Sequence, residues 1–79
     1  MEIDIFVNNF TELFEETEPG SLKPSTKFRD IEEWSSLMAL SVIAMVDEKY
    51  SVRMTGDDIR NSKTVKDLFN IVKSKTKKL

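Results

Sequence analysis

Apolar residues near the start of the chain recur at the spacing of an α-helix. They occupy positions i, i+3, i+4, i+7, i+10 and i+11 of one segment, which is the pattern of a single amphipathic face. The same spacing returns near the end of the chain, and no segment alternates polar and apolar residues for long enough to predict a strand. The sequence therefore predicts an all-α fold, with apolar faces formed by Ile3, Phe6, Val7, Phe10, Leu13 and Phe14 in the first segment and by Val65, Leu68, Phe69 and Val72 in the last.

Two further helices are expected between these segments. The most apolar run, Leu37 to Val46, predicts a helix over 36–50 that begins with a serine N-cap. Thr55 and Asp58 have the spacing of a capping box, which predicts a short third helix. We therefore expect one domain over 1–79, made of three longer helices and one short helix, with helices at 1–17, 36–50, 57–61 and 64–75 and a long loop at 18–35.

The predicted core combines one apolar face from each helix. In the second helix, the face that carries Leu40, Ile43 and Val46 is assigned to the core. The opposite face, which carries Met38 and Met45, is then expected to be partly exposed. The complete predicted core is Phe6, Phe10, Phe14, Leu40, Ile43, Val46, Ile59, Val65, Leu68 and Val72.

Composition excludes several classes of function. The 79 residues include no Cys and no His, so the chain has no thiol, and the commonest general base and metal ligand are absent. Gly20 and Gly56 are the only glycines, so there is no glycine-rich phosphate loop. The acidic pairs of the chain lack a spaced third ligand, which favours solvated surface over a metal site. We therefore expect neither an enzyme nor a metal site.

Charge is divided unevenly along the chain. Residues 1–58 hold 13 Asp/Glu and 5 Lys/Arg, whereas residues 59–79 hold 1 acid and 7 bases. The net charge of −2 does not give the basic footprint of a nucleic-acid binder, and the basic tail is interpreted as a solvated helix end. The start of the chain is acidic, unlike a signal peptide, and the longest apolar run is shorter than the roughly 20 residues of a membrane span. We expect a cytoplasmic monomer that binds neither nucleic acid nor membrane.

Ser36 is the candidate functional residue, in the run Glu33-Trp34-Ser35-Ser36-Leu37. A loop that contains prolines ends there and the apolar helix begins. A hydroxyl in this position lies beside backbone N–H groups that have no partner inside the helix, which favours the attachment of a phosphate. By itself the pattern favours an ordinary helix cap, and Ser35 is a competing candidate for modification.

The order of segments around Ser36 resembles that of the acyl carrier protein family. Ser35-Ser36-Leu37 stands where the family has Asp-Ser-Leu, and a long helix follows. Trp34 is similar to a subgroup whose motif is Trp-Asp-Ser-Leu. Beyond the motif, the family has acids and an aromatic residue at the end of the second helix, then an apolar link, an acidic third helix and a Thr-Val start to the fourth. The matching segments are Asp47–Tyr50, Val52–Met54, Asp57–Ile59 and Thr64–Leu68.

The resemblance implies a four-helix bundle of the acyl-carrier type and a carrier function. A phosphopantetheinyl transferase would attach 4'-phosphopantetheine to Ser36, and acyl groups would ride on this arm as thioesters. Ser35 is then expected to cap the helix. Further expected partners are acyl-loading and acyl-processing enzymes of fatty acid, polyketide or related biosynthesis, with the acyl group in a cleft between the second and third helices or at the surface. The alternatives are a helical protein–protein interaction module without a prosthetic group and, with less support, a small DNA-binding domain.

The surface expected to bind partner enzymes departs from the family pattern. Family members usually carry acids at the motif Asp and on the exposed face of the second helix, where this chain has Ser35, Met38 and Ser41. A more apolar contact is expected, and methionine suits adaptable interfaces. The alternative is that Met38 and Met45 are packing residues; Trp34 is expected to pack on the first or last helix rather than to line the arm. The predicted partner-binding residues are Leu37, Met38, Ser41, Met45, Glu48 and Asp57.

Overall fold

The computed structural model describes residues 3–15 and 20–76. Over these residues the regular structure is helical, apart from one isolated bridge between Lys27 and Thr64. The predicted all-α, four-helix fold is therefore confirmed. In chain order the helices are α1 (Ile3–Thr11), α2 (Ser36–Tyr50), α3 (Gly56–Arg60) and α4 (Val65–Thr76), and a 3₁₀ turn, η1 (Phe28–Asp30), interrupts the long loop before α2.

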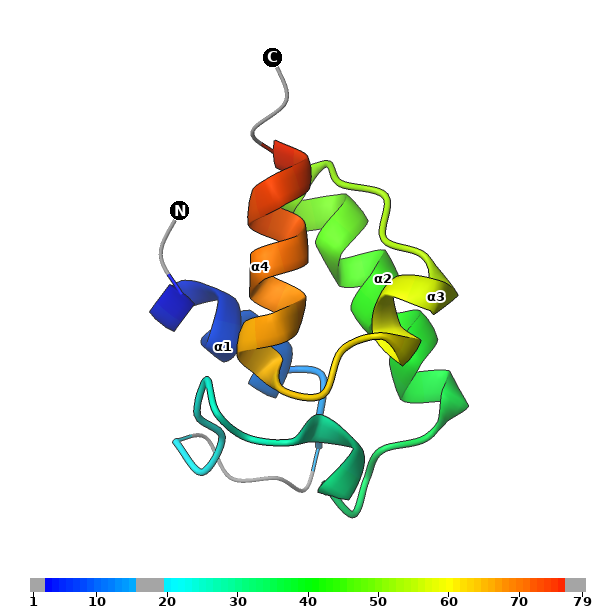
Figure 1. The fold of residues 1–79 in the computed structure, drawn as a ribbon. Coiled ribbons are helices and arrows are strands. Elements are labelled where there is room, and N and C mark those ends of the chain that lie inside the picture. Colours follow the sequence, from blue (N-terminus) through cyan, green and yellow to red (C-terminus); the bar gives the residue numbers. More distant parts are fainter. Residues whose placement is uncertain (1–2, 16–19, 77–79) are drawn as a thin grey trace.

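Helix α4 holds the bundle together, because it contacts each of the other three helices (Figure 1). Helix α2 also packs against α1 and α3. The long loop crosses the end of the bundle where α4 begins (Figure 1). There the N–H of Val65 donates to the carbonyl of Thr26 at 3.1 Å, and the N–H of Lys66 donates to that of Pro24 at 2.8 Å. The loop thus satisfies donors that a helix start leaves unpaired.

The core is one cluster of buried apolar side chains between the helices. Its largest members are aromatic, and burying a side chain of this size contributes roughly 1.5–3 kcal/mol. Two predicted core residues differ from expectation, because Leu40 is 62% exposed and Ile43 is only half-buried. The predicted core residues that are buried are Phe6, Phe10, Phe14, Val46, Ile59, Val65, Leu68 and Val72.

Helix α1 ends earlier than the predicted bound of residue 17. Its last helical residue is Thr11, and residues 1, 2 and 16–19 lie outside the described residues. The Thr11 hydroxyl donates back to the Val7 carbonyl at 2.7 Å, and the N–H of Phe14 donates to Thr11 three residues earlier rather than four. The chain leaves the helix because Phe14 packs on Trp34 and the N–H of Glu15 donates to Glu33. Tertiary contacts thus override the local helical period.

Helix α2 buries a different face from the one predicted. The buried side chains are Val42, Met45 and Val46, whereas Leu37 and Leu40 are 71% and 62% exposed. The sequence could not settle this because α2 is apolar on nearly all sides, so its own period does not mark one face. The packing of α1, α3 and α4 against it makes the choice.

The ends of the helices are closed by side-chain and backbone caps. Thr55 and Asp58 form the predicted capping box at α3. Thr64 and Asp67 form a similar pair at α4, in which the N–H of Asp67 donates to the Thr64 hydroxyl at 3.2 Å. At the end of α2, Ser51 takes the left-handed conformation with φ of 55°, a common way to end a helix.

Candidate functional site

Ser36 is the first residue of α2, and its side chain is exposed. The residue before it, Ser35, has extended backbone with φ of −157° and ψ of 174°, and its hydroxyl accepts the N–H of Met38 at 3.3 Å. The expected capping role of Ser35 is confirmed. Because Ser35 caps the helix, the hydroxyl of Ser36 is not needed for this purpose, and Ser36 is exposed.

A groove of about 470 Å³ opens beside Ser36. Three segments supply its walls: the end of the long loop, the first turn of α2, and α3. Its walls are mixed in character, with apolar surface from Trp34 and Ile59 and two guanidinium groups from Arg29 and Arg60. The complete lining is Arg29, Trp34, Ser35, Ser36, Ala39, Gly56, Ile59 and Arg60.

Arg29 joins two walls of this groove. Its Nη2 donates to the backbone carbonyls of Ile59 at 2.8 Å and Arg60 at 2.9 Å, which lie at the end of α3. Its guanidinium also lies 5.1 Å from the centre of the Phe28 ring. The carbonyls at a helix end lack partners within the helix and carry partial negative charge, so a guanidinium there is favourable. Arg29 thereby fixes the loop to α3 beside Ser36.

Trp34, which lines the groove, is also part of an aromatic cluster. Its ring centre lies 4.8 Å from that of Phe28, 6.4 Å from that of Phe10 and 6.5 Å from that of Phe14. The prediction was that Trp34 packs on the first or last helix, and the contact with Phe10 shows that it packs on the first. The same side chain also lines the groove beside Ser36, a position that the sequence analysis gave only as an alternative.

The predicted partner-binding residues divide by exposure. Leu37, Glu48 and Asp57 are exposed, whereas Met38 and Ser41 are half-buried. Met45 was expected on a partly exposed face, with packing as the alternative, but it is only 4% exposed and belongs to the core. The reason is that the packing of α1, α3 and α4 against α2 buries the face that includes Met45.

The exposed apolar surface of α2 has different members. Leu37, Leu40 and Ala44 are all exposed and lie at i, i+3 and i+7, which places them on one face of the helix. Sequence reasoning missed Leu40 in this role because it was assigned to the core. The stripe begins at the residue after Ser36, and its members do not line the groove.

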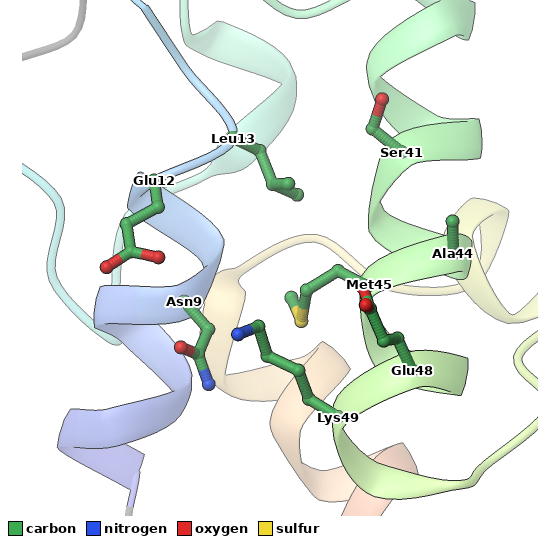
Figure 2. Close-up of a pocket in the computed structure, with 8 residues that line it drawn as sticks. All are labelled: Asn9, Glu12, Leu13, Ser41, Ala44, Met45, Glu48 and Lys49. Atoms are coloured by element: carbon green, nitrogen blue, oxygen red, sulfur yellow. The ribbon is translucent and has the colours of Figure 1, made fainter.

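A second groove, of about 360 Å³, lies between α1 and α2 (Figure 2). Met45 and Lys49 reach from α2 toward Asn9 on α1, and Glu12, the residue after the end of α1, lies on the same side (Figure 2). Ser36 does not line this groove, so three of the predicted partner residues, Ser41, Met45 and Glu48, belong to a different surface. The complete lining is Asn9, Glu12, Leu13, Ser41, Ala44, Met45, Glu48 and Lys49.

The carboxylates with shifted pKa values are helix caps. The hydrogen bond from Lys75 and the N–H of Thr55 hold the pKa of Asp58 below its ordinary value of 3.8. The N–H groups of Lys63 and Thr64 likewise lower the pKa of Asp67. A lowered pKa makes a carboxylate a weaker base, so neither is suited to accept a proton at neutral pH.

Neither a cluster of metal ligands nor a helix suited to a membrane is present among the described residues. Within residues 3–15 and 20–76, no three Asp or Glu side chains gather closely enough to hold a metal ion. Among the same residues, no helix has both the length and the apolar character required to cross a membrane.

Comparison with known proteins gives a likeness in structure rather than in sequence. No protein-family model matches the sequence, and no curated protein does. The structure is similar to the solution NMR structure of a holo acyl carrier protein from Geobacter metallireducens, with a TM-score of 0.76 and 25% identity. The likeness covers 92% of this chain and 83% of that one. The chain therefore has the fold of an acyl carrier protein, and this likeness supports a carrier role.

Proposed function

We propose that this protein is an acyl carrier in which Ser36 is the attachment site for 4'-phosphopantetheine. One observation carries the proposal: in a fold similar to that of a holo acyl carrier protein, Ser36 presents an exposed hydroxyl at the first turn of α2 and at the edge of a groove. A phosphopantetheinyl transferase removes the proton of the Ser36 hydroxyl, whose oxygen attacks the pyrophosphate of coenzyme A; the new bond joins the Ser36 oxygen to phosphorus, the P–O–P bond breaks, and adenosine 3',5'-bisphosphate leaves. The chain itself has no catalytic role in this proposal.

The residues around Ser36 suit a phosphodiester. The first turn of a helix offers N–H donors and a positive dipole end, and Arg29 and Arg60 add two positive charges to the same groove. When bound, the arm supplies the thiol that a chain without Cys lacks, and acyl groups are held on it as thioesters. We place Trp34-Ser35-Ser36-Leu37 with the Trp-Asp-Ser-Leu subgroup. In this chain, Ser35 then takes the capping role that the Asp has in the subgroup motif.

Partner enzymes dock, in this proposal, on the exposed surface next to Ser36. Leu37 is retained from the predicted set, Leu40 replaces the buried Met45, and Asp57 on α3 remains an exposed acid, whereas Glu48 lines the separate groove between α1 and α2. The partners are acyl-loading and acyl-processing enzymes of fatty acid, polyketide or related biosynthesis. A cytoplasmic location and a monomeric state are part of the same proposal.

Intact-mass measurement tests the attachment site. After co-expression with a promiscuous phosphopantetheinyl transferase, the mass of the wild-type chain should rise by one phosphopantetheine. Ser36→Ala should show no rise, whereas the matched control Ser35→Ala should still be modified, because Ser35 only caps the helix. Modification of Ser36→Ala would move the site to Ser35. No rise in the wild type would favour a helical interaction module, which the exposed Leu37 and Leu40 would serve.

A further inference from the structure

We infer that Arg29 is a positioning residue that holds the phosphate of the arm in the groove beside Ser36. The inference rests on the proposed function. It concerns a residue in the long loop, seven positions before Ser36, which the motif around Ser36 does not include. Both residues line the same groove, so a phosphate bonded to the Ser36 oxygen starts at a groove wall that also carries this guanidinium.

Arg29 has hydrogen-bonding capacity left for a phosphate. A guanidinium carries five N–H donors, and the two bonds to Ile59 and Arg60 both come from Nη2. The donors of Nη1 and Nε are not part of these bonds. Guanidinium and phosphate form strong, charge-assisted pairs, which can be bidentate.

The charge of Arg29 also remains available. Its hydrogen-bond partners are neutral carbonyl groups, and within residues 3–15 and 20–76 no carboxylate forms an ion pair with it. Arg60, the other arginine of the groove, differs because it pairs with Asp57, which partly neutralises its charge. Both arginines are exposed, so the ion pair is what distinguishes them. Arg29 is therefore the stronger candidate.

The position of Arg29 is fixed before any phosphate arrives. Two hydrogen bonds to α3 and the contact with the Phe28 ring restrict the side chain. Because the rotamer freedom of an arginine is already reduced, pairing with a phosphate costs less entropy than at a mobile surface arginine. The holo protein should consequently gain a link between Ser36 on α2, Arg29 in the loop, and α3.

The test compares apo and holo forms of the full chain. Holo wild type, Arg29→Gln and Arg29→Lys are first verified by intact mass, and Arg53→Gln serves as the matched control because Arg53 is exposed and does not line the groove. In the wild type and the control, Tm should rise from apo to holo. In Arg29→Gln this rise should be lost, with a smaller rise retained in Arg29→Lys. The ³¹P resonance of the arm should move in Arg29→Gln and not in the control.

The readout is the difference between apo and holo, because Arg29→Gln also removes the bonds to α3 and lowers Tm in both forms. If modified Arg29→Gln keeps the wild-type rise in Tm and the wild-type ³¹P shift, the inference is overturned and the proposed function stands. If no arm attaches to the wild type, the result contradicts both the inference about Arg29 and the proposed function. If Arg29→Gln does not fold, the Nε–H resonance of Arg29 in the wild type decides: the inference requires it to shift between apo and holo.

Discussion

Ser35 and Ser36 are adjacent residues of the same type in different environments. The extended backbone of Ser35 lets its hydroxyl accept the N–H of Met38, whereas Ser36 already has helical backbone and an exposed side chain. One hydroxyl therefore stabilises the helix and the other is available for chemistry. The separation of the two roles depends on backbone conformation at a single residue.

Ser35→Ala should lower the free energy of unfolding by about 1 kcal/mol, because it removes the cap of α2. Ser35→Asp should recover this stability, since Asp also caps and its charge suits the N-terminal end of the helix dipole. Urea denaturation measures both. The control Ser36→Ala should stay within about 0.5 kcal/mol of the wild type. Equal losses from Ser35→Ala and Ser36→Ala would contradict the assignment of the cap.

At the scale of the element, helix α2 serves two surfaces. Val42, Met45 and Val46 are buried in the bundle, and the opposite stripe of Leu37 and Leu40 is exposed next to Ser36. A large apolar side chain in water contributes little to folding, so these two leucines are available to a partner.

Truncations on the two faces of α2 should have very different effects. Met45→Ala should lower the free energy of unfolding by about 2–5 kcal/mol, because it opens a cavity in the core. Leu40→Ala should change it by no more than about 0.5 kcal/mol, since that side chain is exposed. Chemical denaturation of the two variants provides the comparison. A larger loss for Leu40→Ala would restore the face that the sequence predicted.

At the scale of the whole molecule, one lysine links the last helix to the α2–α3 connection. Lys75 Nζ on α4 lies 2.8 Å from Asp58 Oδ2 and donates to the carbonyl of Arg53 at 2.9 Å. Asp58 also accepts the N–H of Thr55 in the capping box. The same carboxylate therefore caps α3 and fixes α3 to α4. Because α3 forms one wall of the groove, this contact helps to keep the groove in place.

Asp58→Asn should lower the free energy of unfolding by about 1 kcal/mol at pH 7, through loss of the cap and of the ion pair. Folding lowers the pKa of Asp58 below 3.8, so its ionised form stabilises the fold fully above that pH and loses this effect as pH falls through the lowered pKa. The difference between variant and wild type should therefore shrink below pH 3.8.

Urea denaturation at pH 7 and pH 3 tests this dependence. Lys75→Met should reproduce part of the loss and add little to Asp58→Asn, because both substitutions break the same ion pair. Lys73→Met, at an exposed position of the same helix, is the matched control and should have an effect of less than about 0.5 kcal/mol. A difference between Asp58→Asn and wild type that is the same at both pH values would rule out this role of the carboxylate.

Local signals in the sequence were sufficient for most of the architecture. Helical spacing identified the apolar faces of α1 and α4. The starts of α3 and α2 are marked by the pairs Thr55–Asp58 and Ser35–Met38, whose capping hydrogen bonds join residues three apart in the chain. Such contacts depend on neighbours along the chain, so they can be read before any tertiary structure is known. The position of Ser36 at the start of α2 follows from the same local signals.

Only the tertiary structure decided which face of α2 is buried and where α1 ends. Both depend on contacts between residues far apart in the chain, such as Phe14 with Trp34. A helix that is apolar on nearly all sides carries no pattern in its own sequence that marks which face is buried. The surroundings of Ser36 have the same origin, because Arg29, a lining residue of the groove, is bonded to carbonyls of α3 about 30 residues further along the chain. The sequence by itself determined the helices and the candidate serine. Long-range packing determined what surrounds that serine, since the free energy of burial depends on which surfaces meet.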